Sequence, residues 1–380
     1  MPTPRQLFRL AGAVLAAALL LAACSSGGSS GEAGPDPEAT TAGELDPGLV
    51  ADLEETFARA VADTGTPGAA VLVRTPDGEW ETAVGSADVE GDVALETGLR
   101  WPIRSITKSF TVTLLLQLAD EGELSLDDTI DAYVDGVPNG DQVTLRQLAD
   151  MTSGLGDYTS EAFIDDFIAD PERWFTLDEL IAYGLAEPAR AEPGTDRFYT
   201  NLNTLLLGRV VEEVTGQPFA EVLDERILTP LGLDDTTYPT GPDDAVADAV
   251  GYAPDEAGDL TPEPVNFSVF GPAGAMISTT DDLATWGEAL VAGGLVDEAT
   301  QQARLEGGPL DAGPEYDTYA QGIGDLAGWW GHTGEGFGFT ALVMQDVDTD
   351  STVAIVANAS GLERHGPTAI FAELAPLLAG

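Results

Sequence analysis

The sequence predicts an α+β fold in which both ends of the folded chain contribute strands to one β-sheet, with a mainly helical segment inserted between them. Runs rich in β-branched and apolar residues lie near the two ends, at residues 69–85 and 339–358. Between residues 105 and 290, apolar residues recur mostly at steps of three and four, as on one face of a helix. A single sheet completed by both ends of the chain accounts for this order.

The first elements are a helix and a β-hairpin. Leu49, Leu53, Phe57 and Val61 stand four residues apart, which predicts a helix over residues 47–63. The next run, A-A-V-L-V-R-T-P-D-G-E-W-E-T-A-V-G, has two strand-like halves joined by P-D-G, the pattern of a hairpin turn.

Helices follow, and strands return near the C-terminus. S-F-T-V-T-L-L-L-Q-L-A-D-E-G predicts a helix that ends at Gly122, and L-N-T-L-L-L-G-R-V-V-E-E-V-T-G predicts one that ends at Gly216, because glycine is favoured just after a helix. Another helix is predicted at residues 281–291. F-T-A-L-V-M-Q-D and S-T-V-A-I-V-A-N predict two strands, and Pro367 near a first helical position predicts a terminal helix.

The acidic turn D-V-D-T-D-S between those strands invites a calcium-loop interpretation. It lacks the glycine at the sixth position and the glutamate at the twelfth that an EF-hand loop needs, so we expect a solvated hairpin turn. Two histidines and one cysteine predict no transition-metal site.

The N-terminus has the pattern of an export signal. Arg5 and Arg9 precede an apolar stretch, residues 10–23, that is shorter than the roughly 20 residues of a spanning helix. It ends in L-A-A-C, which resembles a bacterial lipobox and makes Cys24 the expected lipidation site. An uncleaved anchor, or an ordinary signal with a chance cysteine, is the alternative. The stretch that follows has the composition of a flexible tether.

We therefore expect a lipoprotein signal peptide at residues 1–23, a tether at 24–44, a sheet domain at 45–104 and 291–380, and a mainly helical domain at 105–290. The protein should be exported, anchored by lipid to the outer face of the bacterial cell membrane, and monomeric. The formal net charge of −51 disfavours nucleic acid and anionic lipid as specific partners.

A single lysine stands three residues after a serine, in the run R-S-I-T-K-S-F. Lys108 is the only lysine, whereas the other 14 basic side chains are arginine. If a helix begins at Ser105, the two side chains share a face and can meet. A serine hydroxyl needs a base to become a good nucleophile; arginine cannot deprotonate, but lysine can, once its surroundings lower its pKa from about 10.4 toward 7. A serine and a lysine on a helix surface are the alternative.

Two further stretches carry polar groups suited to such a site. In F-Y-T-N, Tyr199 can relay a proton and Asn201 can orient a substrate carbonyl and bond the lysine, with a packed aromatic and a helix N-cap as alternatives. In G-H-T-G-E-G-F-G-F, glycines let another backbone or a ligand approach a strand, so His332, Thr333 and Gly334 are candidates for a pocket edge. A glycine-rich strand with an incidental histidine is the alternative there.

In this order, S-I-T-K, Y-T-N and H-T-G resemble the three motifs of the penicillin-recognising serine hydrolases. That family includes DD-carboxypeptidases, class C β-lactamases, and related esterases and D-aminopeptidases; its third motif is K-T-G in many members and H-T-G in others. The resemblance extends over about residues 45–378 and includes M-T-S-G-L, T-P-L-G-L-D-D-T and A-G-A-M-I-S-T-T-D-D-L between the motifs.

The resemblance implies an antiparallel sheet flanked by helices, an all-helical second domain, and a cleft between them. It implies acyl transfer through a covalent ester on Ser105, with Lys108 and Tyr199 sharing the role of base; which of the two takes the proton stays open. Backbone N–H groups of Ser105 and Glu335 would form the oxyanion hole. No cofactor or metal is implied. The residues implied in substrate binding are Asn201, His332, Thr333 and Gly334.

Esters, amides or D-amino-acid peptides are the expected substrates, with DD-carboxypeptidase or β-lactamase activity as the alternative. DD-carboxypeptidase relatives hold a substrate carboxylate with a cation before or within the third motif, but Y-A-Q-G-I-G-D-L-A-G-W-W-G contains neither arginine nor lysine. Asp325 and Glu335 add negative charge, so only a protonated His332 would supply positive charge. An anionic substrate would require Arg304 or Arg364 to reach the cleft.

Two further interpretations concern the pocket and the class of function. Trp329 and Trp330 are candidates for the wall of an apolar acyl pocket, with core packing as the alternative. A catalytically silent lipoprotein that binds or senses a ligand at the cell surface is the alternative from another class. Solute-binding chains usually alternate strands and helices around a parallel sheet, and this sequence does not show that alternation.

Overall fold

The computed structural model describes residue 43 and residues 45–379. The predicted signal peptide, the lipidation site Cys24 and, apart from residue 43, the predicted tether lie outside the described residues.

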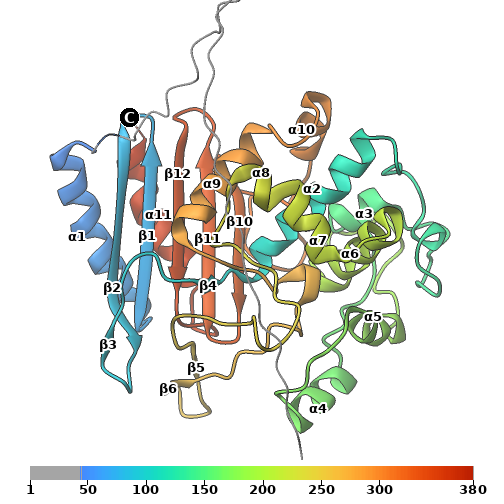
Figure 1. The fold of residues 1–380 in the computed structure, drawn as a ribbon, viewed down its shortest axis with the longest axis horizontal. Helices are drawn as coiled ribbons and strands as arrows, with labels where there is room; N and C mark the ends of the chain where they lie inside the picture. The colour runs from blue at the N-terminus through green and yellow to red at the C-terminus, as the bar shows by residue number, and fades with distance from the viewer. Residues whose placement is uncertain (1–42, 44, 380) are drawn as a thin grey trace, which may run out of the picture. The chain divides into compact units, whose positions relative to one another are not determined.

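Both ends of the described chain contribute strands to one antiparallel sheet, which confirms the predicted fold class (Figure 1). Its eight strands lie in the order β3-β2-β1-β12-β11-β10-β9-β8, and every neighbouring pair is antiparallel. The N-terminal hairpin joins the C-terminal strands where β1 pairs with β12. The strands of the sheet are β1 (Gly68–Thr75), β2 (Gly78–Asp88), β3 (Val93–Ala94), β8 (Thr318–Tyr319), β9 (Gly324–Leu326), β10 (Trp329–Gly336), β11 (Phe339–Asp346) and β12 (Ser351–Ala357).

Helices cover the sheet and fill the inserted segment, which Figure 1 shows grouped beside the sheet. The helices are α1 (Pro47–Thr64), α2 (Thr107–Asp120), α3 (Leu145–Ala149), α4 (Glu161–Ala169), α5 (Leu177–Ala186), α6 (Asn201–Thr215), α7 (Phe219–Leu223), α8 (Thr229–Leu231), α9 (Thr280–Ala292), α10 (Glu298–Arg304) and α11 (Gly366–Leu378). The remaining short strands are β4 (Trp101–Pro102), β5 (Tyr252–Pro254), β6 (Leu260–Pro262) and β7 (Ile277–Ser278). The short helical turns are the 3₁₀ turns η1 (Arg104–Ile106), η2 (Ile130–Ala132) and η4 (Gly271–Ala273), and the π-helical turn η3 (Asp224–Leu228).

The central strands are buried on both faces. On β12, Ile355 belongs to the core formed with α1 and α11, whereas its neighbour Val356 belongs to the core on the opposite face. There α9 packs against β1, β11 and β12. A Cβ at Gly287 of α9 would lie only 2.6 Å from Cγ2 of Val343, so the glycine permits this close approach. Because both faces are covered, these strands appear in the sequence as nearly unbroken apolar runs.

The packing of α9 corrects the expected domain boundary at residue 290. This helix falls inside the range predicted for the helical domain, yet it lies on the sheet. The periodicity of its apolar residues shows that one face is buried but does not show which element covers that face. The helical segment therefore gives way to the sheet layer before Thr280.

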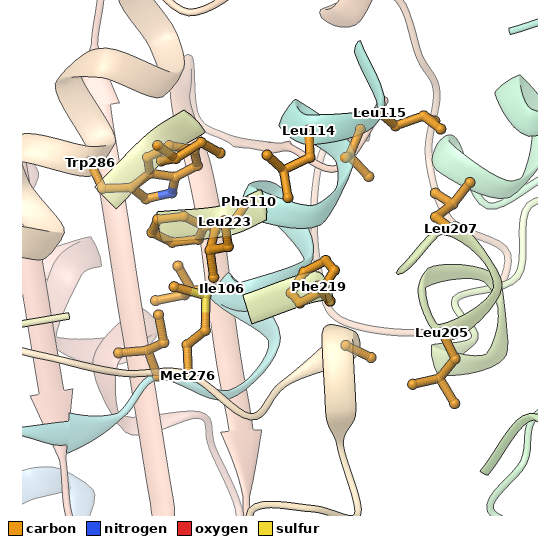
Figure 2. Close-up of a cluster of buried hydrophobic side chains, with 14 of the residues drawn as sticks. Ile106, Phe110, Leu114, Leu115, Leu205, Leu207, Phe219, Leu223, Met276 and Trp286 are labelled. Carbon is orange, nitrogen blue, oxygen red and sulfur yellow. The ribbon is translucent and has the colours of Figure 1, made fainter. Parts of the chain in front are cut away.

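Helix α2 runs through the core and is covered on nearly all sides. Eleven of its 14 residues are buried, as expected for a helix in the centre of a domain. The ring of Phe110 stacks on Trp286 of α9 with centroids 3.7 Å apart, and the two rings lie together in Figure 2. The Trp286 indole N–H donates to Ser109 Oγ over 2.9 Å. The helix that carries Lys108 is therefore held by packing and by polar contacts.

Most predicted elements match the structure within a few residues. The predicted helix at 47–63 is α1, and F-T-A-L-V-M-Q-D forms β11. Gly216 ends α6 in the left-handed conformation with φ 68°, as its position predicted. The acidic turn D-V-D-T-D-S connects β11 to β12. Over residues 45–379, the structure contains no helix with the length and apolar character needed to cross a membrane.

Candidate active site

Ser105 lies in the turn η1, between strand β4 and helix α2. The preceding residue, Arg104, has φ 52°, a left-handed conformation that costs a non-glycine residue about 1–3 kcal/mol. Its buried guanidinium donates to the carbonyl of Gly336 over 2.8 Å and to that of Phe337 over 3.2 Å, at the end of β10. These bonds connect η1, the serine turn, to β10, the strand that carries H-T-G.

Lys108 is fully buried one helical turn after Ser105. Its Nζ lies 2.9 Å from Ser105 Oγ, 2.7 Å from Asn201 Oδ1 and 2.8 Å from the carbonyl oxygen of Ala273. Burial lowers the pKa of Lys108 to about 7, and the Asp157 carboxylate opposes this shift in part. The amine is therefore available without its proton near neutral pH.

Two of the three contacts of Nζ are to groups that can only accept, and this decides what the uncharged amine presents to Ser105. An –NH₂ group has two N–H donors and one lone pair. The Asn201 Oδ1 and the Ala273 carbonyl can only accept, so they take both N–H groups. As an ammonium, Lys108 donates its third N–H to Ser105 Oγ over 2.9 Å. Once the amine is neutral, its lone pair faces the hydroxyl, which can then donate its proton to it.

Asp157 orients Asn201. Its Oδ2 accepts hydrogen bonds from the backbone N–H of Asn201 over 3.1 Å and from Asn201 Nδ2 over 3.2 Å. Asn201 is the first residue of α6, and the residue before it, Thr200, provides no side-chain cap. The Asp157 carboxylate thus accepts a hydrogen bond from an otherwise unpaired N–H at the start of α6. It also fixes the Asn201 side-chain amide so that Oδ1 faces Lys108.

The Tyr199 hydroxyl is buried and, within the described residues, has no hydrogen-bond partner. The Tyr199 ring lies beside Lys108, whose Nζ is 4.9 Å from the ring centroid. Burial raises the pKa of Tyr199 well above 10; Tyr319 and Tyr316 raise it further, and the approach to Ser105 lowers it only in part. The hydroxyl therefore keeps its proton at neutral pH.

Gly334 brings the H-T-G strand against the serine turn. A Cβ at this position would lie 2.2 Å from the carbonyl oxygen of Ile103 and 3.0 Å from the backbone nitrogen of Ser105. No side chain fits there, so the glycine is required by the close approach of two backbones.

The backbone N–H of Glu335 points to the free edge of β10. β9 pairs with β10 only as far as Gly331, and the N–H of Thr333 donates to the Tyr316 hydroxyl over 2.7 Å. Amide directions alternate along an antiparallel strand, so the Glu335 N–H leaves the same edge, two residues on. With the Ser105 N–H at the adjacent turn, it forms a candidate pair of oxyanion donors.

His332 is placed differently from the prediction. It is fully buried and contacts the carbonyl of Thr333 through Nδ1 over 2.6 Å and the Tyr319 hydroxyl through Nε2 over 3.2 Å. Burial, followed by the nearby Lys108, lowers the pKa of His332 to about 3. Its ring does not line the cleft and stays neutral, so it supplies neither a substrate contact nor positive charge. Because the strand is covered on both faces, the His332 ring lies in the core and forms its hydrogen bonds there.

A cleft of about 720 Å³ opens at the serine. It brings together predicted residues from three distant parts of the chain. The predicted residues in its lining are Ser105, Tyr199, Asn201, Thr333, Gly334 and Glu335.

Charged side chains in this lining differ from those expected. Glu315, Glu363 and Glu335 contribute acids, and Arg364 contributes a cation from the loop before α11. Asp325, expected near the cleft, is absent from its lining. The cleft therefore has an excess of negative charge but also one arginine.

Three other candidates lie away from the cleft lining. Arg304 is buried and donates to the carbonyls of Gln321 and Ser109. Trp329 packs edge-on against Phe371 of α11, with ring centroids 5.3 Å apart. Neither Trp329 nor Trp330 contributes to the cleft wall.

The sequence profile of the Beta-lactamase family matches residues 53–375, a range that includes all three motifs. The chain belongs to this family.

Two curated relatives of this β-lactamase family chain are longer proteins, and the chain aligns with only part of each. Protein flp of Staphylococcus aureus strain MW2 is 29% identical over 229 residues, which are 58% of this chain and 44% of that protein. A D-aminopeptidase of Brucella anthropi is 31% identical over 259 residues, 67% of this chain and 48% of that protein. The chain thus spans less than half the length of these relatives.

Solved structures of the same fold align over most of the chain. A D-stereospecific amidohydrolase from Streptomyces sp. has a TM-score of 0.73 at 30% identity and covers 85% of this chain and 98% of its own. An octameric penicillin-binding protein homologue from Pyrococcus abyssi has a TM-score of 0.74 at 28% identity and covers 87% of this chain and 77% of its own. The monomeric state expected here stays a prediction.

Sequence analysis did not predict several site residues of this family member. Asp157 and the Ala273 carbonyl became apparent only from their contacts with Asn201 and Lys108. Arg364 had been named only as one of two arginines that could reach the cleft, and the structure places it in the lining.

His365 lines the cleft as well and contacts the Gly334 carbonyl of the H-T-G strand. Its only signal in the sequence was rarity, because the chain has two histidines and the other, His332, belongs to H-T-G.

Proposed function

We propose that the protein is a serine hydrolase that acts by acyl transfer through a covalent ester on Ser105. The observation that carries this proposal is the contact between Ser105 Oγ and the buried Nζ of Lys108, 2.9 Å apart, with the pKa of Lys108 lowered to about 7. A surface serine–lysine pair would have neither the burial nor the two carbonyl acceptors that orient the amine.

In the acylation step, Ser105 Oγ gives its proton to the neutral Lys108 amine and attacks the substrate carbonyl carbon. The new Oγ–C bond places negative charge on the carbonyl oxygen, which the N–H groups of Ser105 and Glu335 stabilise. The tetrahedral intermediate then expels its amine or alcohol. The leaving group takes a proton from the Tyr199 hydroxyl, and the Lys108 ammonium then returns a proton to Tyr199. Nζ of Lys108 lies 4.9 Å from the centre of the Tyr199 ring.

Deacylation reverses these roles with water as the nucleophile. Lys108 takes a proton from the attacking water, the water oxygen bonds to the acyl carbon, and the Oγ–C bond breaks. Ser105 then recovers its proton from the lysine, and the acid product leaves. Asn201 holds Lys108 in place through both steps, because its own amide is fixed by Asp157.

Small amides and esters, and in particular amino-bearing substrates of D configuration, are the substrate class that we propose. Glu315, Glu335 and Glu363 in the cleft favour a substrate with an ammonium group over one with a free carboxylate. The names of two relatives, a D-aminopeptidase and a D-stereospecific amidohydrolase, support this class.

Covalent labelling tests the proposed function. A fluorophosphonate probe should modify the wild-type protein at Ser105, as located by peptide mass spectrometry, and Ser105→Ala should remain unlabelled with an unchanged circular dichroism spectrum. Absence of a Ser105 adduct, combined with saturable binding of small amides, would support the silent binding protein instead.

A DD-carboxypeptidase is the second candidate, and Arg364 is the observation that favours it. The guanidinium in the cleft lining can hold a substrate carboxylate, and such a charge-assisted bond contributes about 10- to 150-fold in affinity.

The two substrate classes can be separated by comparing kcat/KM for D-alanine amide with that for a peptide ending in D-Ala-D-Ala. We expect the amide to be preferred in wild type. A tenfold preference for the peptide that disappears in Arg364→Ala would establish the carboxypeptidase.

We also propose export as a lipoprotein anchored through Cys24. The charged, apolar and L-A-A-C segments of the first 24 residues support this location. Extraction with a phase-separating detergent tests it, because a lipidated protein enters the detergent phase.

A further inference from the structure

His365 forms a hydrogen bond to the strand that carries the predicted oxyanion donor. It is the N-cap residue of α11, and its Nε2 lies 3.0 Å from the carbonyl oxygen of Gly334. Its Nδ1 lies 2.8 Å from Thr368 Oγ1 and 3.3 Å from the Thr368 backbone nitrogen. The side chain thus connects the first turn of a helix with β10.

These contacts determine the tautomer of the ring. A backbone N–H can only donate, so Nδ1 must offer its lone pair to Thr368. A carbonyl oxygen can only accept, so Nε2 must carry the proton that it donates to Gly334. Burial lowers the pKa of His365, while the Gly334 carbonyl and Glu335 oppose the shift, so the neutral form with Nε2–H is the one that this geometry describes.

The accepting carbonyl belongs to the same peptide group as the oxyanion donor. The bond between Gly334 and Glu335 joins the C=O of the first residue to the N–H of the second. A hydrogen bond that is donated to a peptide oxygen polarises the whole group, because of its resonance, and makes its N–H a stronger donor. His365 therefore acts on the Glu335 N–H from the opposite end of one planar unit.

We propose that His365 is a positioning residue that strengthens the Glu335 N–H as a donor of the oxyanion hole. This inference rests on the proposed acyl-transfer function. His365 need not contact the reacting atoms, because its effect passes through the Gly334–Glu335 peptide.

Neighbouring contacts hold this peptide firmly enough for such an effect. On one side of it, Arg104 donates to the carbonyls of Gly336 and Phe337. On the other, the Glu335 carboxylate accepts from the Gly361 backbone N–H over 2.9 Å, in the loop that leads to His365. The strand end is fixed against both the serine turn and the loop before α11, so one added hydrogen bond changes its electronic state more than its position.

Two substitutions separate this role from helix capping. His365→Asn keeps an acceptor for Thr368 at the N-cap but is too short to reach Gly334. His365→Gln places an amide N–H where Nε2 was, but glutamine is a poor N-cap residue. If His365 serves only the helix, the glutamine variant should be the damaged one; if it serves the oxyanion hole, the asparagine variant should be.

The discriminating measurement compares an ester with its thiono analogue, for example p-nitrophenyl acetate and p-nitrophenyl thionoacetate. Sulfur is a weak hydrogen-bond acceptor, so the ratio of kcat/KM for the two reports on the oxyanion donors rather than on general integrity. A whole donor is worth about 10²- to 10³-fold and polarisation contributes about 10–30% of a bond's strength, so His365→Asn should lower the ester-to-thionoester ratio about 2- to 8-fold. His365→Gln should keep a ratio near that of wild type.

The possible results are separable. A wild-type protein that hydrolyses neither ester and takes up no fluorophosphonate contradicts the proposed function. An active wild type whose ratio is unchanged in His365→Asn, or one in which both esters slow equally, overturns the role of His365 and leaves the acyl-transfer function intact. Circular dichroism and thermal unfolding of each variant show whether a loss of activity follows from misfolding. If one variant misfolds, the ester-to-thionoester ratio of the other variant tests the role of His365.

Discussion

Acylation should slow as the pH falls below 7, because Lys108 then holds the proton that it must accept from Ser105. Burial lowers the pKa of this lysine from 10.5 to about 7, whereas the pKa of Tyr199 is raised well above 10. The two candidate bases therefore predict different pH profiles. A lysine base gives a rate that rises up to about pH 7 and then levels off, and a tyrosine base gives a rate that climbs far into the alkaline range.

The size of the effect follows from the environment of Nζ. At pH 7 an unshifted lysine would be neutral in only about one molecule in 3,000, whereas with a pKa of about 7 half of the molecules are neutral. Below the pKa, kcat/KM should fall about tenfold per pH unit, so that the rate at pH 5 is about 100-fold below the plateau. Lys108→Arg keeps the charge but cannot deprotonate, so the plateau should drop about 10²- to 10⁴-fold, the usual contribution of a general base.

The assay is kcat/KM for p-nitrophenyl acetate from pH 5 to pH 10, corrected with Ser105→Ala for hydrolysis without the enzyme. Tyr199→Phe keeps the ring against Lys108 and removes the hydroxyl, so its plateau should fall while the break stays near pH 7. The assignment of Lys108 as base would be refuted by a break near pH 7 that persists in Lys108→Arg, or by a wild-type rate that still climbs above pH 9.

Three further changes test other parts of the site and of the chain. Asp157→Asn keeps an acceptor but removes the charge that raises the pKa of Lys108, so the break in the pH profile should move to lower pH; an upward shift would contradict the electrostatic argument. Gly334→Ala should abolish labelling by fluorophosphonate and lower the melting temperature, because its Cβ would lie 2.2 Å from the Ile103 carbonyl oxygen, and unchanged labelling would show that the turn can yield. Cys24→Ser should move the expressed protein from the detergent phase to the aqueous phase, whereas mature wild-type protein without lipid mass would exclude anchoring at Cys24.

Local patterns predicted most of the fold. The spacing of apolar residues located α1, α2, α6 and α9, and the strand-like runs located β11 and β12. The short strands β8 and β9 were not predicted, because two or three residues carry no periodicity. The place of α9 on the sheet was also missed, since an apolar helix face does not identify its partner.

The structure brings predicted site residues together where the prediction rested on residue type and on spacing within one element; their catalytic roles stay predictions. Ser105 and Lys108 meet because a separation of three residues brings side chains together on a helix. Gly334 was singled out because only glycine permits a close backbone approach, and that approach is present. The prediction for His332 was wrong, because a strand that is buried on both faces gives no sign of which side faces a cleft.

Taken alone, the sequence determined the order of helices and strands, the family and the pair of residues at the centre of the proposed chemistry. These features depend on local periodicity or on motifs whose residues are near one another in the chain. The tertiary structure alone decided the state of those residues. Lys108 owes its low pKa to burial and is oriented by Asn201 and Ala273, which are 93 and 165 positions away. Arg364 and His365 reach the cleft only because α11 packs against α1 and the strands β11 and β12. Burial, charge and hydrogen-bond partners are properties of the packed core, and they arise from contacts that no short stretch of sequence contains.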